Sequence, residues 1–257
     1  MKLESTLRAA RDQGRKLLVP YVTGGFSKDW LDVVRAVADA GADAIEVGIP
    51  FSDPIMDGPT VQEASVLALK SGATPRGIVA SLAGFDGDTP IVVMTYYNPV
   101  HHAGHERFAG ALASAGIDGA IVPDLPLDEL DGWGDAADSA GVETVLLAAP
   151  TTHDDRLDAI CKRSRGFVYG VSLLGVTGER ASLSARALVM GHRLKAATDM
   201  PVLLGVGVST PEQAVEAASA ADGVIVGSAL VRRLLEGGGP GGAGAFVGSL
   251  RAALDEG

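Results

Sequence analysis

Cysteine, positive charge and long apolar runs are scarce in this sequence. Among its 257 residues Cys161 is the only cysteine, so an internal disulfide is excluded, which fits a reducing compartment. Lysine and arginine number 21 against 32 acidic residues, and the net charge of −11 argues against nucleic acid or an anionic membrane as main partner. Residues 1–16 lack an apolar core, and no run approaches the length of a membrane span. We therefore expect a soluble, cytoplasmic protein.

Apolar residues, in contrast, are abundant and regularly spaced. They make up 47% of the chain, which is enough for one sizeable core, and we expect residues 1–257 to form a single domain. Segments of helical period separate eight short apolar or β-branched runs, at residues 15–22, 43–48, 90–97, 119–124, 143–149, 166–172, 201–207 and 223–228. Apolar strands that alternate with amphipathic helices indicate a parallel sheet covered by helices.

The segment between the first two runs illustrates the helical pattern. In residues 27–41, Ser27 is placed to cap a helix and Gly41 to end it. The apolar residues on one face of this helix are Trp30, Val33, Val34 and Val37. Near the other end of the chain, the glycine-rich segment 236–245 predicts a flexible surface connection to a last helix.

Faint internal repetition suggests how the strands are arranged. Residues 40–50, 115–126 and 219–229 each pass from a helix end through a small turn and an acid into a strand. Repeated βα units with eight strands predict an α/β fold, a closed (β/α)8 TIM barrel with an extra N-terminal helix. An open doubly wound sheet is the alternative.

Glu46 stands out because it interrupts an apolar strand. It alternates with Ile45 and Val47, so it points into the barrel, where burial raises the pKa of a carboxyl toward the range useful for proton transfer. Asp57 follows in a loop whose prolines can hold it against the barrel mouth. Without further information, a structural ion pair for Glu46 and an ordinary turn for Asp57 remain equally good interpretations.

Two glycine turns late in the chain favour a phosphate site. Each follows a strand and leads directly into a helix, and in such barrels backbone N–H groups at these turns often bind phosphate. The donors would come from Gly207, Gly227 and Ser228. The long segment 172–182, with glycines at positions 175 and 178, reads as a lid, or alternatively as a surface loop without function.

Three histidines, His101, His102 and His105, lie close together in the sequence HHAGH. Such a group can bind a metal, but no neighbouring cysteine supports a metal site. We expect an exposed loop after the third strand, without a metal.

The segment EVGIPFSDPIMDGPTVQ, residues 46–62, closely resembles the signature of the tryptophan synthase α subunit family. The similarity extends along nearly the whole chain. It includes the motifs VPYVTGG, YNPV, PDLP, GVTG, GVGVSTPEQ and GSALV. The family consists of (β/α)8 barrels, so the resemblance implies the same fold as the spacing of the strands.

The resemblance also implies roles for individual residues. It places the acid–base carboxylate on Glu46, and on Asp57 the carboxylate that binds the indole N–H and stabilises the positively charged indolenine. Tyr169 matches the tyrosine of the sixth strand beside the first acid. The positions that match the phosphate donors are Gly178, Gly207, Gly227 and Ser228. Those expected to line the indole pocket are Tyr21, Met94, Tyr96, Ile121 and Thr177.

The implied reaction is the retro-aldol cleavage of indole-3-glycerol phosphate to indole and glyceraldehyde 3-phosphate in tryptophan biosynthesis, with no metal or organic cofactor. The implied partner is a tryptophan synthase β subunit that carries pyridoxal phosphate, in an α2β2 assembly, with loops 50–58 and 172–185 as contacts. The alternatives are a stand-alone lyase that releases free indole, a catalytically silent activator of a β subunit, and another phosphate-binding barrel such as an epimerase or sugar-phosphate isomerase.

Overall fold

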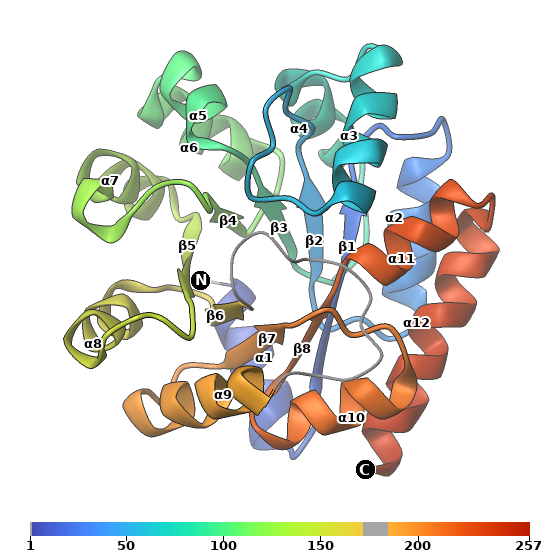
Figure 1. Cartoon of the computed structure of the whole chain (residues 1–257). Coiled ribbons are helices and arrows are strands. Elements are labelled where there is room, and N and C mark those ends of the chain that lie inside the picture. Colours follow the sequence, from blue (N-terminus) through green and yellow to red (C-terminus); the bar gives the residue numbers. More distant parts are fainter. Residues whose placement is uncertain (1, 172–184) are drawn as a thin grey trace.

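The computed structural model describes residues 2–171 and 185–257, and its centre is a closed parallel barrel (Figure 1). The strands pair in chain order, and β8 returns to pair with β1. They are β1 (Leu17–Thr23), β2 (Ile45–Gly48), β3 (Ile91–Met94), β4 (Gly119–Ile121), β5 (Glu143–Ala148), β6 (Val168–Val171), β7 (Val202–Gly205) and β8 (Gly223–Val226). Seven of the eight predicted runs contain one of these strands, and β1 extends one residue beyond the first run, 15–22. The closed barrel is therefore confirmed, and the open sheet is excluded.

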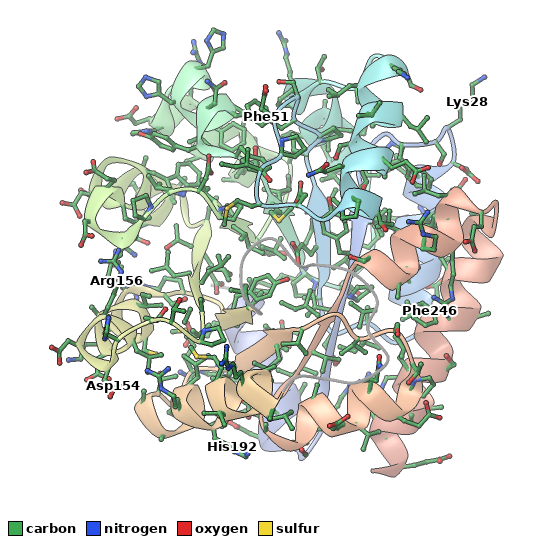
Figure 2. All side chains as sticks on the ribbon, viewed as in Figure 1. Lys28, Phe51, Asp154, Arg156, His192 and Phe246 are labelled. Carbon is green, nitrogen blue, oxygen red and sulfur yellow. The ribbon has the colours of Figure 1, made fainter. Side chains whose placement is uncertain are left out.

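Helices surround the barrel on the outside (Figure 1). They are α1 (Lys2–Asp12), α2 (Trp30–Asp39), α3 (Pro59–Lys70), α4 (Pro75–Leu82), α5 (Tyr97–Ala103), α6 (His105–Ser114), η1 (Leu127–Glu129), α7 (Asp131–Ala140), α8 (Asp154–Arg163), α9 (Ala185–Ala197), α10 (Pro211–Ser219), α11 (Ser228–Leu235) and α12 (Gly239–Glu256). Charged side chains such as Lys28, Asp154 and Arg156 project outward at the periphery (Figure 2). None of the helices in residues 2–171 and 185–257 is long and apolar enough to cross a membrane.

The strands are apolar on both faces because each face packs against a different layer. One cluster lies between the sheet and the surrounding helices and includes Ile45, Val47 and Val93. The other fills the barrel interior, with strand residues Leu17, Val19, Val92, Ile121, Val145, Leu203 and Ile225. Because successive residues of a strand point to opposite faces, Glu46 shares the inner face, as its alternation with Ile45 and Val47 predicts.

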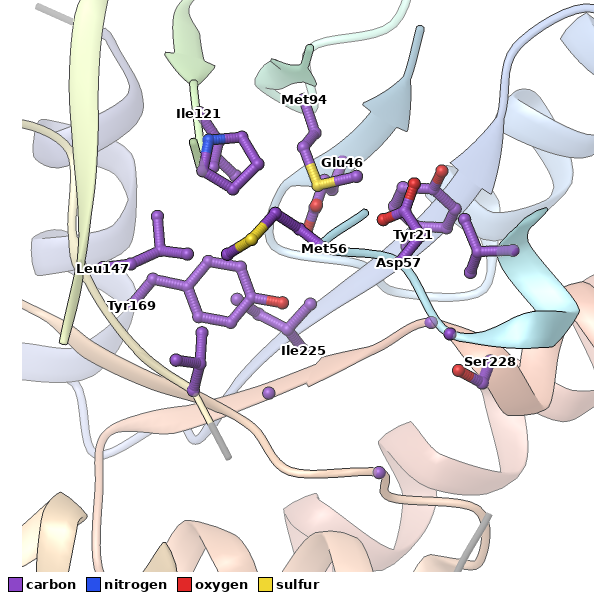
Figure 3. Close-up of a pocket in the computed structure, with 17 residues that line it drawn as sticks. Tyr21, Glu46, Met56, Asp57, Met94, Ile121, Leu147, Tyr169, Ile225 and Ser228 are labelled. Atoms are coloured by element: carbon purple, nitrogen blue, oxygen red, sulfur yellow. The ribbon is translucent and has the colours of Figure 1, made fainter. Parts of the chain in front are cut away.

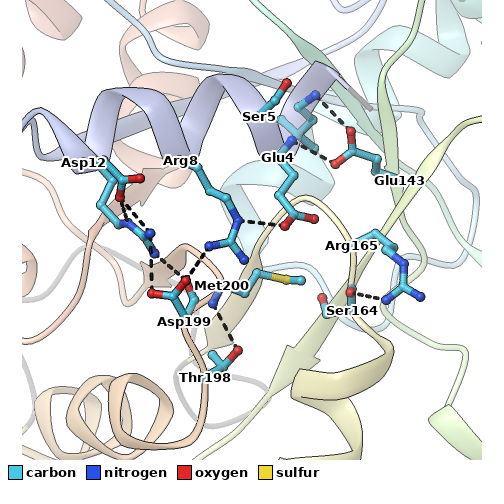
Figure 4. Close-up of polar contacts among 12 residues, drawn as sticks. Glu4, Ser5, Arg8, Asp12, Glu143, Ser164, Arg165, Thr198, Asp199 and Met200 are labelled. Atoms are coloured by element: carbon cyan, nitrogen blue, oxygen red, sulfur yellow. Dashed lines mark hydrogen bonds and ion pairs between the residues drawn. The ribbon is translucent and has the colours of Figure 1, made fainter.

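Helix α1 closes the N-terminal end of the barrel. Leu3 and Leu7 are fully buried in the interior cluster. The carboxylate of Glu143, on β5, accepts hydrogen bonds from the backbone N–H groups of Leu3 at 3.0 Å and Glu4 at 2.8 Å (Figure 4). These are among the N–H groups that a helix start leaves without an intrahelical partner. The predicted N-terminal helix is thus confirmed, and the opposite, C-terminal end of the strands is left for a site.

Helix α2 confirms the predicted apolar face but not the predicted cap. Its four buried residues are Trp30, Val33, Val34 and Val37. The helix begins only at Trp30, so Ser27 lies outside it, and within the described residues the buried Ser27 hydroxyl has no hydrogen-bond partner. Gly41 follows the helix with φ +96°, a conformation suited to glycine.

Two segments predicted as loops are helical. Most of the glycine-rich segment 236–245 belongs to α12, which starts at Gly239. A Cβ at Gly244 would lie 3.3 Å from the carbonyl oxygen of Ala36, so the absence of a side chain lets α12 approach α2 closely. Burial of this face compensates for the low helix propensity of glycine. Likewise, the three histidines lie in α5 and α6 rather than in an exposed loop.

Candidate active site

A pocket opens at the C-terminal ends of the strands, on the side of the barrel away from α1 (Figure 3). Nine of the residues singled out in the sequence line it: Tyr21, Glu46, Asp57, Met94, Ile121, Tyr169, Gly207, Gly227 and Ser228. Gly178 and Thr177 lie outside the described residues, as does segment 172–184 of the expected lid. Tyr96 is absent from the described pocket lining, and its position is given below.

Glu46 is the innermost acid of the pocket. It sits on β2, is only 1% exposed, and points toward the interior beneath the mouth (Figure 3). Its Oε2 atom has no hydrogen-bond partner among the described residues. Burial, followed by the nearby negative charge of Asp57, raises the pKa of Glu46 to about 8. A buried carboxyl oxygen without a hydrogen-bond partner lowers the stability of the fold. Such an oxygen is expected in an active site, where the substrate supplies the missing partner.

Asp57 reaches the same pocket from the loop between β2 and α3. The loop folds back through a turn in which the Asp57 N–H donates to the carbonyl oxygen of Pro54 at 3.0 Å. Gly58 then caps α3, which starts at Pro59. Burial raises the pKa of Asp57 to about 6, and the nearby Tyr96 hydroxyl opposes this rise.

The two carboxyl groups therefore differ in charge near neutral pH. With a pKa of about 8, Glu46 is mostly protonated at pH 7, whereas Asp57, with a pKa of about 6, is mostly ionised. The negative charge of Asp57 favours a protonated Glu46, because a second negative charge in the same apolar pocket would be repelled. The site thus holds a proton donor and a fixed negative charge at the same time.

Two tyrosine rings flank Glu46. Burial raises the pKa of both Tyr21 and Tyr169 well above its usual value, so both stay neutral. Glycines on neighbouring strands make room for the rings: a Cβ at Gly48 would collide with the Tyr21 ring, and one at Gly205 would collide with the Tyr169 ring. Gly205 also lines the pocket, although sequence reasoning did not identify it.

The remaining wall is largely apolar. Lining residues that the sequence analysis did not name are Met56, Gly58, Val61, Pro123, Leu147, Val171, Gly205 and Ile225. For Leu147 and Ile225 a signal exists in the sequence, since each occupies an inward-facing position near the end of its strand. Val61, in contrast, comes from α3 and enters the site only because that helix packs beside the mouth.

Gly207, Gly227 and Ser228 form the edge of the pocket at β7 and β8. Gly207 has φ +82°, where a side chain would strain the backbone. Gly227 is the N-cap of α11, and Ser228 is the first residue of this helix. A Cβ at Gly227 would lie 3.6 Å from Tyr21 Cβ, so this position faces the pocket. The N–H groups at the start of α11 are suited to an anion at this edge.

Tyr96 packs against the loop that carries Asp57. It is 2% exposed and forms the N-cap of α5. Its hydroxyl accepts a hydrogen bond from the Met56 N–H at 2.9 Å, and its ring stacks on Phe51 with 5.2 Å between ring centroids. The structure thus places Tyr96 against the 50–58 loop.

The three histidines are remote from this pocket. His105 Nε2 lies 3.0 Å from the Tyr97 hydroxyl, and the His105 ring contacts Trp133. Within residues 2–171 and 185–257, no group of three or more His, Cys, Asp or Glu side chains is arranged to hold a metal ion. The described contacts of His105 are those of a packed aromatic cluster.

Two carboxyl groups, an apolar wall and helix N–H groups at the edge of a (β/α)8 barrel define an enzyme site for proton transfer. Such a site suits a small substrate with one apolar part and one anionic part. The comparisons with known proteins agree. The family model described as tryptophan synthase alpha chain matches residues 7–239, and the chain belongs to this family. Members of the family cleave indole-3-glycerol phosphate, so the chain is a carbon–carbon lyase of tryptophan biosynthesis.

Individual relatives support the same assignment. The tryptophan synthase alpha chain of Streptomyces coelicolor is 46% identical over 238 residues, which cover 91% of this chain and 88% of that protein. The one from Thermobifida fusca is 43% identical, with 91% and 89% covered. Among solved structures, tryptophan synthase from Mycobacterium tuberculosis gives a TM-score of 0.92 at 40% identity, with 98% of both chains covered. Alpha chains of this family work with a beta subunit.

Proposed function

We propose that Glu46 is the general acid and base of this cleavage and that Asp57 is its charge-stabilising carboxylate. The main support is that two carboxyl groups face one pocket with different pKa values, about 8 for Glu46 and about 6 for Asp57. At neutral pH the first has a proton to donate and the second offers a negative charge. Both functions are needed, because indole is a poor leaving group until its ring is protonated.

In the first step, Glu46 donates its proton to the ring carbon that bears the glycerol side chain. The ring becomes an indolenine, whose positive charge is centred on the ring nitrogen. The ionised Asp57 accepts a hydrogen bond from this N–H and stabilises the charge as it develops. The unpartnered Oε2 of Glu46 fits this step, because this oxygen has no hydrogen bond among the described residues to give up.

In the second step, the Glu46 carboxylate removes the proton of the glycerol hydroxyl next to the ring. The carbon–oxygen bond becomes a carbonyl, the carbon–carbon bond breaks, and its electron pair returns to the ring. The products are indole and glyceraldehyde 3-phosphate. The proton from the hydroxyl restores Glu46 to its starting state, so one carboxyl group serves both steps.

The pocket suits the two parts of the substrate. Met94, Ile121 and Leu147 offer an apolar wall for the indole ring, and the neutral Tyr169 adds a ring beside Glu46. At the opposite edge, Gly207, Gly227 and Ser228 are proposed to bind the phosphate through backbone N–H groups. On the resemblance alone, Gly178 adds a phosphate donor and Thr177 a contact to the indole ring.

No metal or organic cofactor is needed for these steps. Glu46 donates and removes the proton, and Asp57 stabilises the positive charge on the indole ring. Pyridoxal phosphate is assigned to the β subunit only. We further propose an α2β2 assembly, in which loop 50–58 contacts the β subunit. Ile55 in this loop is 77% exposed beside the mouth through which indole must leave. A cytoplasmic location is part of the proposal, because a phosphorylated substrate does not cross membranes unaided.

An assay of indole release from indole-3-glycerol phosphate tests these roles. We expect Glu46→Gln to lower kcat by at least the roughly 10²–10⁴-fold that general acid–base catalysis contributes, with substrate binding largely retained. Glu143→Gln is a matched control, since Glu143 is also a fully buried carboxyl but lies at the α1 end of the barrel. Near-normal turnover of Glu46→Gln would reject the assignment. A wild-type chain that binds substrate yet makes no indole, even with the β subunit, would instead be a silent activator.

A further inference from the structure

Tyr96 is buried at the end of β3 and touches the loop that carries Asp57 in several places. Its ring stacks on Phe51 with an interplanar angle of 25°, and its hydroxyl accepts a hydrogen bond from the Met56 N–H at 2.9 Å. Phe51 lies near the start of this loop (Figure 2). One side chain thus contacts both the start and the end of loop 50–58.

The same hydroxyl lies near the carboxyl of Asp57 and lowers the pKa of that carboxyl. A phenol has one proton to donate, and it can accept through its oxygen at the same time. The Met56 N–H donates to the hydroxyl oxygen, so the hydroxyl proton can point toward the Asp57 carboxylate. Burial and the charge of Asp57 raise the pKa of Tyr96, so this proton stays on Tyr96. The Tyr96 oxygen therefore holds the backbone at residue 56, directly before the carboxyl of residue 57.

Few other contacts hold the end of this loop. The Asp57 N–H donates to the Pro54 carbonyl oxygen within the loop, and the Gln62 side chain donates to the Asp57 carbonyl oxygen at 2.9 Å. Both bonds hold the backbone of Asp57. Its side chain depends on its neighbours, of which the Tyr96 hydroxyl is the one that favours the ionised carboxyl.

We propose that Tyr96 is a positioning residue for the cleavage reaction: its hydroxyl orients the Asp57 carboxylate toward the pocket and keeps it ready to accept the indole N–H. The inference rests on the proposed role of Asp57. It gives Tyr96 a role besides the expected lining of the indole pocket, because its hydroxyl and ring contact the loop that carries Asp57.

The charge state of Asp57 gives this role a measurable consequence. The titratable groups that face Asp57 are Glu46 on β2, Tyr21 on β1, Tyr169 on β6 and Tyr96 itself, while Asp124 faces Tyr96 from beyond β4. Of these, the Tyr96 hydroxyl lowers the pKa of Asp57. Its removal raises that pKa above about 6, so less of the enzyme has an ionised Asp57 at neutral pH.

The test is Tyr96→Phe, which keeps the ring that stacks on Phe51 and removes only the hydroxyl. We expect kcat to fall roughly 10- to 100-fold at pH 7, the effect of losing a hydrogen bond to a charged group, with a smaller change in KM. The acid limb of the pH–rate profile should move to higher pH. Tyr97→Phe is the matched control, because it removes the hydroxyl beside His105 and should leave both kcat and profile unchanged.

A double-mutant cycle with Asp57→Asn distinguishes positioning from a general structural effect. If Tyr96 acts through Asp57, adding Tyr96→Phe to Asp57→Asn should cost much less than it costs in the wild type. An equal cost in both backgrounds, or a pH profile of Tyr96→Phe that superimposes on the wild-type profile, would overturn the inference. If Asp57→Asn alone retained full activity, the proposed role of Asp57 would fail first.

Discussion

At the scale of single residues, the pocket gives two similar carboxyl groups different properties through their surroundings. Glu46 is enclosed by the barrel interior, and Asp57 lies on a half-exposed loop with a tyrosine hydroxyl beside it. Burial raises the pKa of both, but the charge of Asp57 adds to the rise at Glu46, whereas the Tyr96 hydroxyl opposes the rise at Asp57. The division into acid and stabilising charge thus follows from position more than from residue type.

The pH dependence of catalysis follows directly. Activity requires an ionised Asp57 and a protonated Glu46, so the rate should rise with pH through about 6 and fall through about 8. The measurement is kcat/KM for indole production between pH 5 and 9. The substrate phosphate also titrates near about 6, so the profile of Asp57→Asn is the control. An acid limb of unchanged size in this variant would assign that limb to the phosphate.

Asp57→Asn itself should lower kcat more than it raises KM, because the charge matters most in the transition state. The melting temperature should hardly change, since a loop acid contributes little packing. The readouts are steady-state kinetics together with thermal unfolding. A variant that unfolds easily while its folded fraction turns over normally would show that Asp57 is structural.

Glu46 should also make stability depend on pH. Its pKa is about 8 in the folded protein against an ordinary value of 4.5, so the folded state binds more protons between these values. The free energy of unfolding therefore falls as the pH rises from about 5 to 8, and Glu46→Gln should remove this loss. We expect the variant to melt several degrees above wild type at pH 8 and close to it at pH 5. Equal melting temperatures of wild type and Glu46→Gln at pH 8 would contradict a pKa of Glu46 that burial raises.

At the scale of secondary-structure elements, two glycines at the phosphate edge are needed for different reasons. Gly227 has room for a methyl group on the protein side, whereas Gly207 has φ +82°, which an L side chain rarely adopts. Gly227→Ala should therefore leave stability unchanged but weaken binding of a glycerol-phosphate analogue, with indole-fragment affinity retained. Gly207→Ala should lower stability as well. Calorimetry measures the affinity for the two ligands, and urea unfolding measures the stability. An equal loss of affinity for both ligands in Gly227→Ala would argue against separate phosphate and indole subsites.

Helix α1 provides a second prediction at this scale. Glu143→Ala removes the acceptor for the N–H groups of Leu3 and Glu4 and leaves them in a buried position. We expect a loss of about 1–3 kcal/mol in the free energy of unfolding. The folded fraction should keep its kcat, because Glu143 lies at the end of the barrel opposite the pocket. A large fall in kcat without a loss of stability would mean that the two ends of the barrel are coupled.

At the scale of the whole molecule, the mouth of the pocket is where a partner would act. Indole is small and apolar and diffuses away readily, so direct transfer to a β subunit is advantageous. If the β subunit orders the loops over Glu46 and Asp57, it should raise kcat, and a bound glycerol-phosphate analogue should tighten the association in return.

Titration with the β subunit from the same source, followed by indole production, measures this coupling. Ile55→Asp should weaken the association, whereas Leu67→Asp on α3, where an apolar side chain is 41% exposed, serves as the control. The absence of any rate increase at saturating β subunit, together with fast turnover of the chain alone, would favour the stand-alone lyase.

The sequence by itself determined the barrel and the inner acid. Eight apolar runs separated by helical segments specify a parallel sheet with both faces covered, because only such a sheet buries both faces of each strand. The inward direction of Glu46 follows from the two-residue period of a strand. Asp57 was recognised through the family signature, since spacing alone allowed an ordinary turn acid.

The tertiary structure decided what depends on contacts between distant segments. The glycine-rich segment 236–245 became helical because α12 packs closely on α2, a contact between residues such as Ala36 and Gly244 that no local pattern reveals. The contact of Tyr96 with loop 50–58 is also decided in three dimensions, because its hydroxyl accepts a hydrogen bond from Met56, 40 residues earlier in the chain. The pKa values of about 8 and 6 likewise arise only when β2, the loop and β3 meet, because desolvation and charge act through space rather than along the sequence.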